Sequence, residues 1–145
     1  MGCKKGFLLN DLKELVPGIK IYGIEDHIYP INKSMKKVRK HIKFSNYYDL
    51  PFKSNYFDAV FSFHCIYRLN FGDMIKAIKE IQRVSKKNTY ITLGAYYDQK
   101  GKLLYDKWGI ISTSHLHVSD WKKIFKYIKY KGDYSFTTPE SLGLK

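Results

Sequence analysis

Two hydrophobic periodicities alternate along the chain, and this alternation limits the folds that it can adopt. Apolar residues recur at helical spacing in segments 7–16, 74–84 and 121–128, and mark one face of each expected helix. Runs rich in β-branched and aromatic residues lie at 19–24, 57–63 and 89–93, as is typical of strands. Strands that alternate with helices favour parallel pairing. The sequence therefore predicts an α/β fold with a mainly parallel sheet and helices on both faces.

Weaker signals complete the expected order of elements. Residues 28–39 favour a short helix, 41–44 a brief strand and 134–137 a final strand, while Ser119 is expected to cap the last helix. The strand at 57–63 is so apolar that we expect both of its faces to be covered. Because no repeat or linker divides the sequence, we expect residues 1–145 to form a single domain.

The chain is strongly basic, with 26 Lys and Arg residues against 13 Asp and Glu residues and a formal net charge of +13. Such a charge attracts polyanions, so nucleic-acid binding is one alternative function. The lysines are nevertheless spread along the chain, and Lys, Ile, Tyr and Asn are abundant together, which is typical of an AT-rich genome. A binding footprint should gather on one face. We therefore favour a partner other than nucleic acid.

Cysteine content and hydropathy indicate the compartment. Cys3 and Cys65 form neither a disulfide framework nor the paired spacing of a zinc site. The opening residues lack the apolar region of a signal peptide, and no apolar run reaches the ~20 residues that span a bilayer. We expect a cytoplasmic protein with reduced thiols and no membrane contact.

Four segments occur in an order that resembles the class I S-adenosylmethionine-dependent methyltransferases. They are the glycine-bearing turn at 2–9, the strand end Tyr22-Gly23-Ile24-Glu25, the segment 46–52 with its Leu-Pro-Phe motif, and the strand 56–62 with its Phe-Asp-x-Val motif. Each segment alone is weak, but the Leu-Pro-Phe motif followed by Phe-Asp-x-Val is specific. The resemblance runs in segment order from about residue 2 to residue 132, and it implies a Rossmann-like domain.

The resemblance also implies a cofactor and its binding residues. S-adenosylmethionine would bind with its methionine end at Gly2 and Gly6, its ribose hydroxyls at Glu25, and its adenine at Asn46 and Tyr47. A carboxylate suits the ribose because it can accept hydrogen bonds from both hydroxyls. His64 follows the strand that ends at the methyl donor, and it is the expected residue near the acceptor. His64 could also be an ordinary core histidine.

The sequence departs from the family pattern at two places. Lys4 stands where the family has the middle glycine of the turn, so a positive φ there would strain the backbone by roughly 1–2 kcal/mol. Met1 directly precedes Gly2, so the family's central first strand and its acidic residue are lacking. Three explanations stay open: the chain is a fragment of a longer protein, the sheet closes without that strand, or the gene has decayed.

Several functions remain open on sequence alone. The first is methyl transfer to an unidentified acceptor, for which we favour a small molecule over nucleic acid. The second is an inactive remnant of the fold that serves as a binding or structural protein, for example through its basic surface. His115 and His117 are two imidazoles without a third ligand at suitable spacing, so we expect no metal site. The oligomeric state cannot be derived from this sequence.

Overall fold

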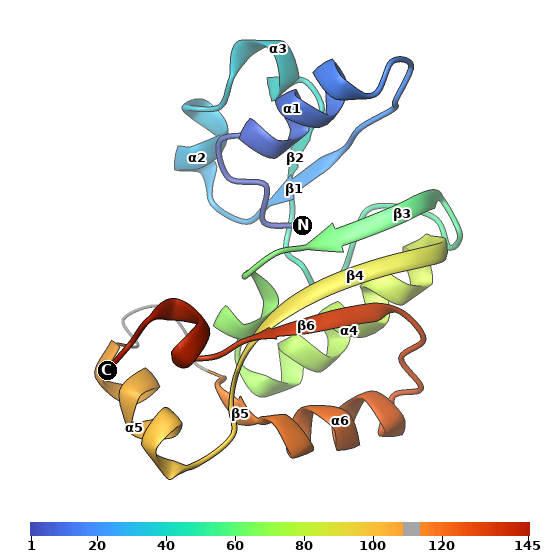
Figure 1. The fold of residues 1–145 in the computed structure, drawn as a ribbon. Helices are drawn as coiled ribbons and strands as arrows, with labels where there is room; N and C mark the ends of the chain where they lie inside the picture. Colours follow the sequence, from blue (N-terminus) through green and yellow to red (C-terminus); the bar gives the residue numbers. More distant parts are fainter. Residues whose placement is uncertain (109–113) are drawn as a thin grey trace.

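The computed structural model contains 145 residues, of which the described parts are residues 1–108 and 114–145 (Figure 1). In chain order the elements are α1 (Phe7–Leu15), β1 (Gly23–Glu25), α2 (Ile28–Asn32), α3 (Lys36–Arg39), β2 (Ile42–Phe44), β3 (Phe57–Ser62), the 3₁₀ helix η1 (Ile66–Arg68), α4 (Phe71–Val84), β4 (Ser85–Tyr96), α5 (Gln99–Trp108), β5 (Leu116–His117), α6 (Val118–Tyr127), β6 (Asp133–Thr137) and the 3₁₀ helix η2 (Glu140–Leu142).

The described strands form two separate parallel ladders. In the smaller ladder β1 pairs with β2, and Ile24 lies opposite Lys43. In the larger one β4 lies between β3 and β6, and its carboxyl end also pairs with the short β5. Strands β1 and β3 face each other without pairing. The result is a Rossmann-like parallel arrangement that is interrupted between β1 and β3, where the family has its first strand.

Helix α4 carries the main hydrophobic core of the larger sheet. Its start is capped by Asn70, whose side-chain oxygen accepts a hydrogen bond from the backbone N–H of Asp73 at 3.0 Å. The buried face of α4 consists of Met74, Ala77, Ile78, Ile81 and Val84. Helix α6 adds Trp121 and Phe125 to the same core, and the Trp121 indole donates to the Gly94 carbonyl oxygen at 3.0 Å. Figure 1 shows α4 behind the larger sheet.

A second, smaller core holds α1 against the β1–β2 ladder. Leu9 of α1 packs with Ile21, Val38 and Ile42, all of which are buried. Because α1 and α3 bury their apolar faces here rather than on α4, each ladder has its own packed helices. The two cores therefore position two halves of one parallel arrangement.

The sequence predicted the order and parallel direction of the elements, and local details differ. The expected strand at 19–24 is reduced to β1, and the helix expected at 28–39 is divided into α2 and α3. The cap of α6 is His117 rather than Ser119, because the His117 ring accepts from the Ser119 N–H. In the connection after β4, residues 99–108 form α5, and residues 109–113 lie outside the described part.

The expectation that β3 is covered on both faces is wrong. Val60 and Ser62 are buried toward α4, whereas Phe61 is 42% exposed and stacks on Phe63 at 5.9 Å between ring centroids. Since side chains alternate along a strand, the apolar run at 57–63 supplies two faces, and α4 covers one of them. Phe61 and Phe63 belong to the uncovered face.

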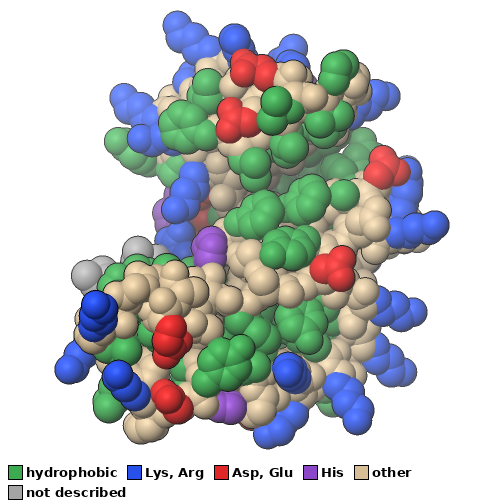
Figure 2. All heavy atoms as spheres, in the orientation of Figure 1, with side chains coloured by type: hydrophobic (Ala, Val, Ile, Leu, Met, Phe, Trp, Pro, Cys, Tyr) green, Lys and Arg blue, Asp and Glu red, His purple; other side chains and the backbone are tan. Residues whose placement is uncertain are grey.

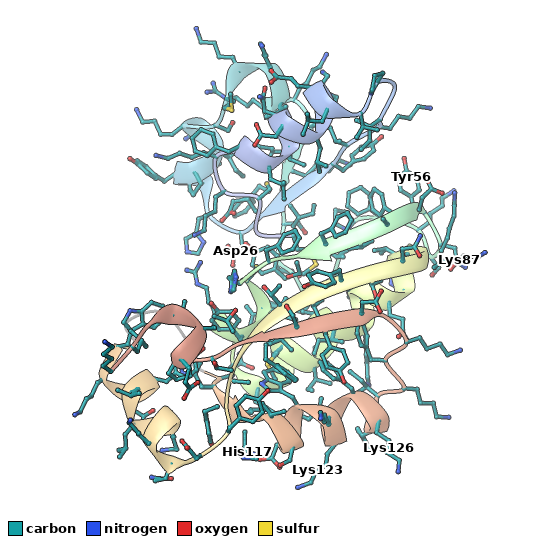
Figure 3. All side chains as sticks on the ribbon, viewed as in Figure 1. Asp26, Tyr56, Lys87, His117, Lys123 and Lys126 are labelled. Atoms are coloured by element: carbon teal, nitrogen blue, oxygen red, sulfur yellow. The ribbon has the colours of Figure 1, made fainter. Side chains whose placement is uncertain are left out.

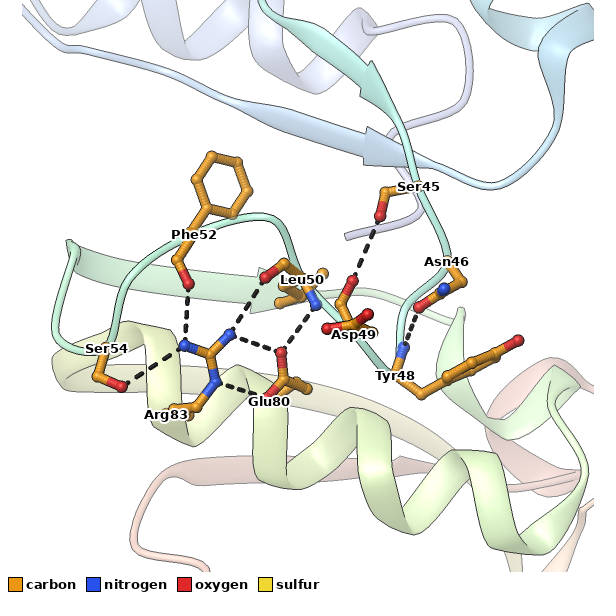
Figure 4. Close-up of polar contacts among 9 residues, drawn as sticks. All are labelled: Ser45, Asn46, Tyr48, Asp49, Leu50, Phe52, Ser54, Glu80 and Arg83. Carbon is orange, nitrogen blue, oxygen red and sulfur yellow. Dashed lines mark hydrogen bonds and ion pairs between the residues drawn. The ribbon is translucent and has the colours of Figure 1, made fainter.

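The Leu-Pro-Phe segment is tied to α4 by Arg83 (Figure 4). The Arg83 guanidinium donates to the carbonyl oxygens of Leu50 at 3.1 Å and Phe52 at 2.9 Å, and it pairs with Glu80. Glu80 in turn accepts the Leu50 N–H at 2.8 Å. The hydrogen bonds from Arg83 hold the pKa of the Glu80 carboxyl below its usual value. The segment that leads to β3 is therefore fixed in place by one ion pair.

Within the described residues, none of the helices is long and apolar enough to cross a membrane. On the face in Figure 2, Lys and Arg side chains lie around the outline of the molecule rather than over one region. On that face the basic side chains do not form the clustered footprint that nucleic-acid binding requires.

Replacing Arg83 by alanine tests the connection between the segment and α4. We expect Arg83→Ala to lower the free energy of unfolding by about 1–3 kcal/mol, because two carbonyl groups and a carboxylate lose their donor. Urea unfolding followed by circular dichroism measures the loss. The matched control is Lys79→Ala on an exposed position of the same helix, which should change stability by less than about 0.5 kcal/mol. Equal effects of the two substitutions would contradict this account.

Candidate functional site

The first residues of the chain connect the two ladders at the carboxyl ends of β1 and β3. The backbone N–H groups of Gly2 and Cys3 donate to the Ile24 carbonyl oxygen at 2.9 and 3.1 Å. The amino group of Met1 donates to the Phe61 carbonyl oxygen at 2.6 Å. In open parallel sheets, ligands bind beyond the carboxyl ends of the strands. The turn that starts the chain therefore lies at the edge where a site is expected.

Glycine is required at two positions of this turn. Gly2 has φ 65° and Gly6 has φ 80°, both in the left-handed region. A Cβ atom at Gly2 would lie 2.6 Å from the Cys65 Sγ atom, and one at Gly6 would lie 2.8 Å from a Val38 methyl group. Lys4 between them has φ 48°, so a residue that bears a side chain also adopts the left-handed region, with the strain that this implies.

Glu25 at the end of β1 is bound to the turn. Its side chain is only 5% exposed, and its Oε2 atom accepts the backbone N–H of Lys4 at 2.8 Å. Its other oxygen lies 3.7 Å from the His27 Nδ1 atom. The structure thus places Glu25 against the turn that runs from Gly2 to Gly6, and the strained Lys4 supplies the hydrogen bond that joins them.

Tyr47 comes to the same place from the segment after β2. Its hydroxyl donates to the Asp26 carboxylate at 2.8 Å and accepts the Asp26 N–H at 3.3 Å. Burial alone would raise the pKa of Asp26, but hydrogen bonds from Tyr47 and His27 lower it overall. Asp26 is labelled in Figure 3 at the junction of the two ladders. Asp26 therefore stays ionised at neutral pH and anchors Tyr47.

Asn46 precedes Tyr47 and is half-buried. Its side-chain oxygen accepts the backbone N–H of Tyr48 at 3.2 Å (Figure 4). This hydrogen bond uses one lone pair of the side-chain oxygen, which is the atom expected to accept a hydrogen bond from the adenine amino group. The second lone pair of that oxygen stays available. Asn46 thus shapes the turn after β2 as well as lying beside Tyr47.

His64 follows β3 in a left-handed conformation, with φ 49°. Its backbone N–H donates to the Thr92 hydroxyl at 2.8 Å, which fixes the turn, and its ring meets the Tyr67 ring edge-on at 6.3 Å. Burial, followed by the charge of Lys4, lowers the pKa of His64, so the imidazole is neutral at pH 7. Burial raises the pKa of the neighbouring Cys65 thiol to about 11, which makes it a poor nucleophile.

The two histidines of the His-Leu-His motif do not share a site. The His115 ring stacks on Tyr105 at 4.0 Å between centroids, whereas His117 caps α6 and its Nε2 atom lies 2.7 Å from the Tyr97 carbonyl oxygen. Figure 3 labels His117 next to α6. Another group, Glu25, Asp26 and His27, has ligand atoms within 4.8 Å of one another. Hydrogen bonds to Lys4 and Tyr47 account for its two carboxylates, and we assign no metal to it.

A cavity of about 890 Å³, which we call the inter-sheet cavity, lies between β1 and β3. Its lining includes Gly2, Lys4 and His64 at the end with the turn, and it does not include Glu25, Asn46 or Tyr47. The cavity therefore borders the candidate site rather than containing it. No direct signal in the sequence indicates the role of Asp26, because its partner Tyr47 is 21 positions away.

Comparisons with known proteins agree with this geometry. The family model described as "Methyltransferase domain" matches residues 1–93. Among solved structures, the methyltransferase from Haloferax volcanii in complex with the Trm112 methyltransferase activator has a TM-score of 0.69 at 17% identity, over 88% of this chain and 57% of that one. The YcgJ protein of Bacillus subtilis has a TM-score of 0.69 at 14% identity, over 88% and 58%.

A SAM-dependent methyltransferase from Thermotoga maritima has a TM-score of 0.61 at 19% identity, over 88% of this chain and 60% of that one. These likenesses concern the fold. The chain spans less than two thirds of the length of each of these three structures. No curated protein matches the sequence.

Replacing Lys4 by glycine tests the strain in the turn. We expect Lys4→Gly to raise the free energy of unfolding by about 0.5–1 kcal/mol, because relief of the left-handed strain exceeds the entropy that glycine adds to the unfolded chain. The control is Lys5→Gly, where φ is not positive and glycine should only destabilise. Thermal unfolding of both variants measures the difference. A destabilised Lys4→Gly variant would show that the lysine side chain contributes more than its strain costs.

Proposed function

The chain belongs to the class I, Rossmann-like family of S-adenosylmethionine-dependent methyltransferases, and from this premise we propose that it binds S-adenosylmethionine and transfers its methyl group to a small-molecule acceptor. The observation that carries the proposal is the hydrogen bond from the Lys4 N–H to Glu25. It joins the glycine turn to the acidic strand end at the edge where parallel sheets bind ligands.

The residues present fit such a cofactor. Gly2 and Gly6 carry no side chain, so a ligand can approach the backbone closely at these two positions of the turn. The Oε2 atom of Glu25 uses one of its lone pairs for Lys4, and Oε1 retains acceptor capacity for a ribose hydroxyl. Tyr47, held by Asp26, and Asn46 border the same edge and are our candidates for the adenine side.

Methyl transfer requires the protein mainly to align the methyl donor with the acceptor. When bound, S-adenosylmethionine supplies a methyl group on a sulfonium, which is already a good leaving group. The chain would orient the ribose through Glu25 and the methionine end through the turn, so that an acceptor can approach in line. No acid or base with a strongly activated pKa is needed for this step.

His64 is our candidate for the residue near the acceptor. It lies at the end of β3 beside the turn, and its neutral imidazole can accept a proton from an acceptor hydroxyl or amine. The Tyr67 ring lies next to it, and the His115 ring lies on from Tyr67, with 6.1 Å between the centroids of those two rings. The three rings form an aromatic surface at this edge. A small acceptor with an apolar or aromatic body suits this surface.

Other functions receive less support. The basic side chains do not gather on the face in Figure 2, and we keep a small molecule rather than nucleic acid as the proposed acceptor. Since the Haloferax volcanii protein was solved with Trm112, a partner protein for this chain is compatible with the shared fold. The alternative of an inactive remnant of the fold is decided by the calorimetry described below, in which a remnant would not bind the ligand. A cytoplasmic location stays a prediction.

Calorimetry with S-adenosylhomocysteine tests cofactor binding. We expect the unaltered chain to bind the ligand and Glu25→Gln to weaken binding by about tenfold or more, because an amide replaces the carboxylate that accepts from the ribose. Glu14→Gln, on the exposed face of α1, is the matched control and should bind like the unaltered chain.

Circular dichroism of each variant shows whether it is folded. The absence of heat with the unaltered, folded chain would favour the inactive remnant. Equal affinity of the Glu25→Gln variant and the unaltered chain would remove Glu25 from the site while leaving cofactor binding intact.

A further inference from the structure

We propose that Thr137, the last residue of β6, is a positioning residue for His64. Its hydroxyl oxygen accepts a hydrogen bond from the Nδ1–H group of His64, so that the imidazole offers an unprotonated Nε2 atom to the methyl acceptor. The His64 Nδ1 atom and the Thr137 Oγ1 atom lie 3.5 Å apart, although the two residues are 73 positions apart in the sequence. The inference rests on the proposed function, because it assigns a partner to the residue that we place near the acceptor.

Two threonines on neighbouring strands hold His64 over one face of the larger sheet. Thr92 of β4 accepts the backbone N–H of His64, and Thr137 of β6 contacts its ring. Gly94 lies opposite Thr137 in the β4–β6 ladder. Since side chains alternate along a strand and paired residues share a face, Thr92 and Thr137 lie on the same face, away from the buried Leu93. The backbone and the ring of His64 are therefore held by separate hydroxyl groups.

The backbone of His64 is strained where Thr92 holds it. Strand β3 ends at Ser62, and His64 then adopts φ 49° in the left-handed region. Such a conformation in a residue other than glycine costs energy, and it persists where the surrounding structure fixes it, often at functional sites. The hydrogen bond to Thr92 fixes it here. The strain is consistent with a ring that must be held in one orientation.

Thr137 is itself fixed in place by α5 and β4. The buried Tyr105 of α5 donates its hydroxyl hydrogen bond to the Thr137 carbonyl oxygen, and its ring stacks on that of His115. A Cβ atom at Gly94 would lie 2.7 Å from the Cδ2 atom of His115, so the absence of a side chain at Gly94 lets the imidazole lie over β4. The hydroxyl of Thr137 thus belongs to a residue whose backbone is bound from two sides.

The partner of Nδ1 decides which nitrogen of His64 can take a proton. In a neutral imidazole one nitrogen carries hydrogen and the other accepts, and the hydrogen bond made by one nitrogen selects the form. Because the pKa of His64 is lowered by burial and then by the charge of Lys4, the ring is neutral at pH 7 and has such a choice. A threonine hydroxyl can accept from Nδ1–H. The lone pair is then on Nε2.

The Nε2 atom of His64 is open to an acceptor. The residue is exposed, and within residues 1–108 and 114–145 its ring forms a hydrogen bond only through Nδ1. The proton of the acceptor's O–H or N–H group would pass to Nε2 while the acceptor bonds to the methyl carbon and the carbon–sulfur bond breaks. Solvent then takes the proton from the exposed ring. The distance of 3.5 Å is long for a neutral pair, and such contacts shorten when the ring is charged and the ligand is bound.

Nitrogen NMR of the imidazole rings in the isotope-labelled, ligand-free chain tests the proposal. The spectra are recorded above neutral pH, where the ring is uncharged, and the His64 signals are assigned by their loss in His64→Gln. We expect the Nδ1–H form of His64 to predominate, whereas a free histidine ring favours Nε2–H. Thr137→Val keeps the side-chain shape and removes the hydroxyl, so the ratio of the two forms should move toward Nε2–H by about fivefold or more.

Two further variants separate the hydroxyl from the strand. Thr137→Ser keeps the hydroxyl and should keep the Nδ1–H form. Ser135→Ala is the matched control on the same strand and face, because the Ser135 hydroxyl accepts from Tyr90 rather than contacting His64. It should leave the ratio of the two forms unchanged. Circular dichroism shows that each variant is folded.

The proposal fails if the Nε2–H form of His64 predominates in the unaltered, folded chain, a result that needs no variant. It also fails if Thr137→Val leaves the ratio unchanged, or if Thr137→Ser behaves like Thr137→Val. Calorimetry with S-adenosylhomocysteine should give the same affinity for Thr137→Val and the unaltered chain, because Thr137 contacts His64 and not Glu25. An unaltered chain that gives no heat would remove the proposed function, while the NMR ratio would still decide whether Thr137 orients His64.

Discussion

The hydrogen bonds of the first three residues hold the two ladders at a common edge. Gly2 and Cys3 donate to β1 through Ile24, and Met1 donates to β3 through Phe61. Strands β1 and β3, which do not pair with each other, are thus held next to one another by residues 1–3, where the glycine turn begins. Because ligands of parallel sheets bind at the carboxyl edge, this connection also assembles the candidate site.

The turn at residues 2–6 is strained at Lys4, and it also forms part of the candidate site. Its glycines adopt positive φ where a Cβ atom would collide with Cys65 or Val38, so their identity follows from close packing. Lys4 adopts the same region at an energetic cost and gives its N–H to Glu25. Strain of this kind persists where the surrounding structure fixes the backbone. Here the buried carboxylate of Glu25 and the bonds to Ile24 fix it.

The inter-sheet cavity and the candidate cofactor site are neighbours with different chemistry. The cavity is bordered by apolar side chains and strand edges, whereas the site contains the carboxylates of Glu25 and Asp26 and the Tyr47 hydroxyl. Gly2 and Lys4 belong to both.

The sequence by itself determined the alternation of helices and strands and the parallel direction of the sheet. Both follow from short-range hydrophobic periodicity. Only the tertiary structure decided that β1 and β3 stay apart around a cavity and that Phe61 remains exposed. It also decided that Asp26 anchors Tyr47 and that Lys4 is bound to Glu25. Each of these depends on which distant segments meet, and on which backbone groups find a partner. Hydrophobic pattern does not encode that pairing, because it fixes which face of an element is buried but not the neighbour that covers it.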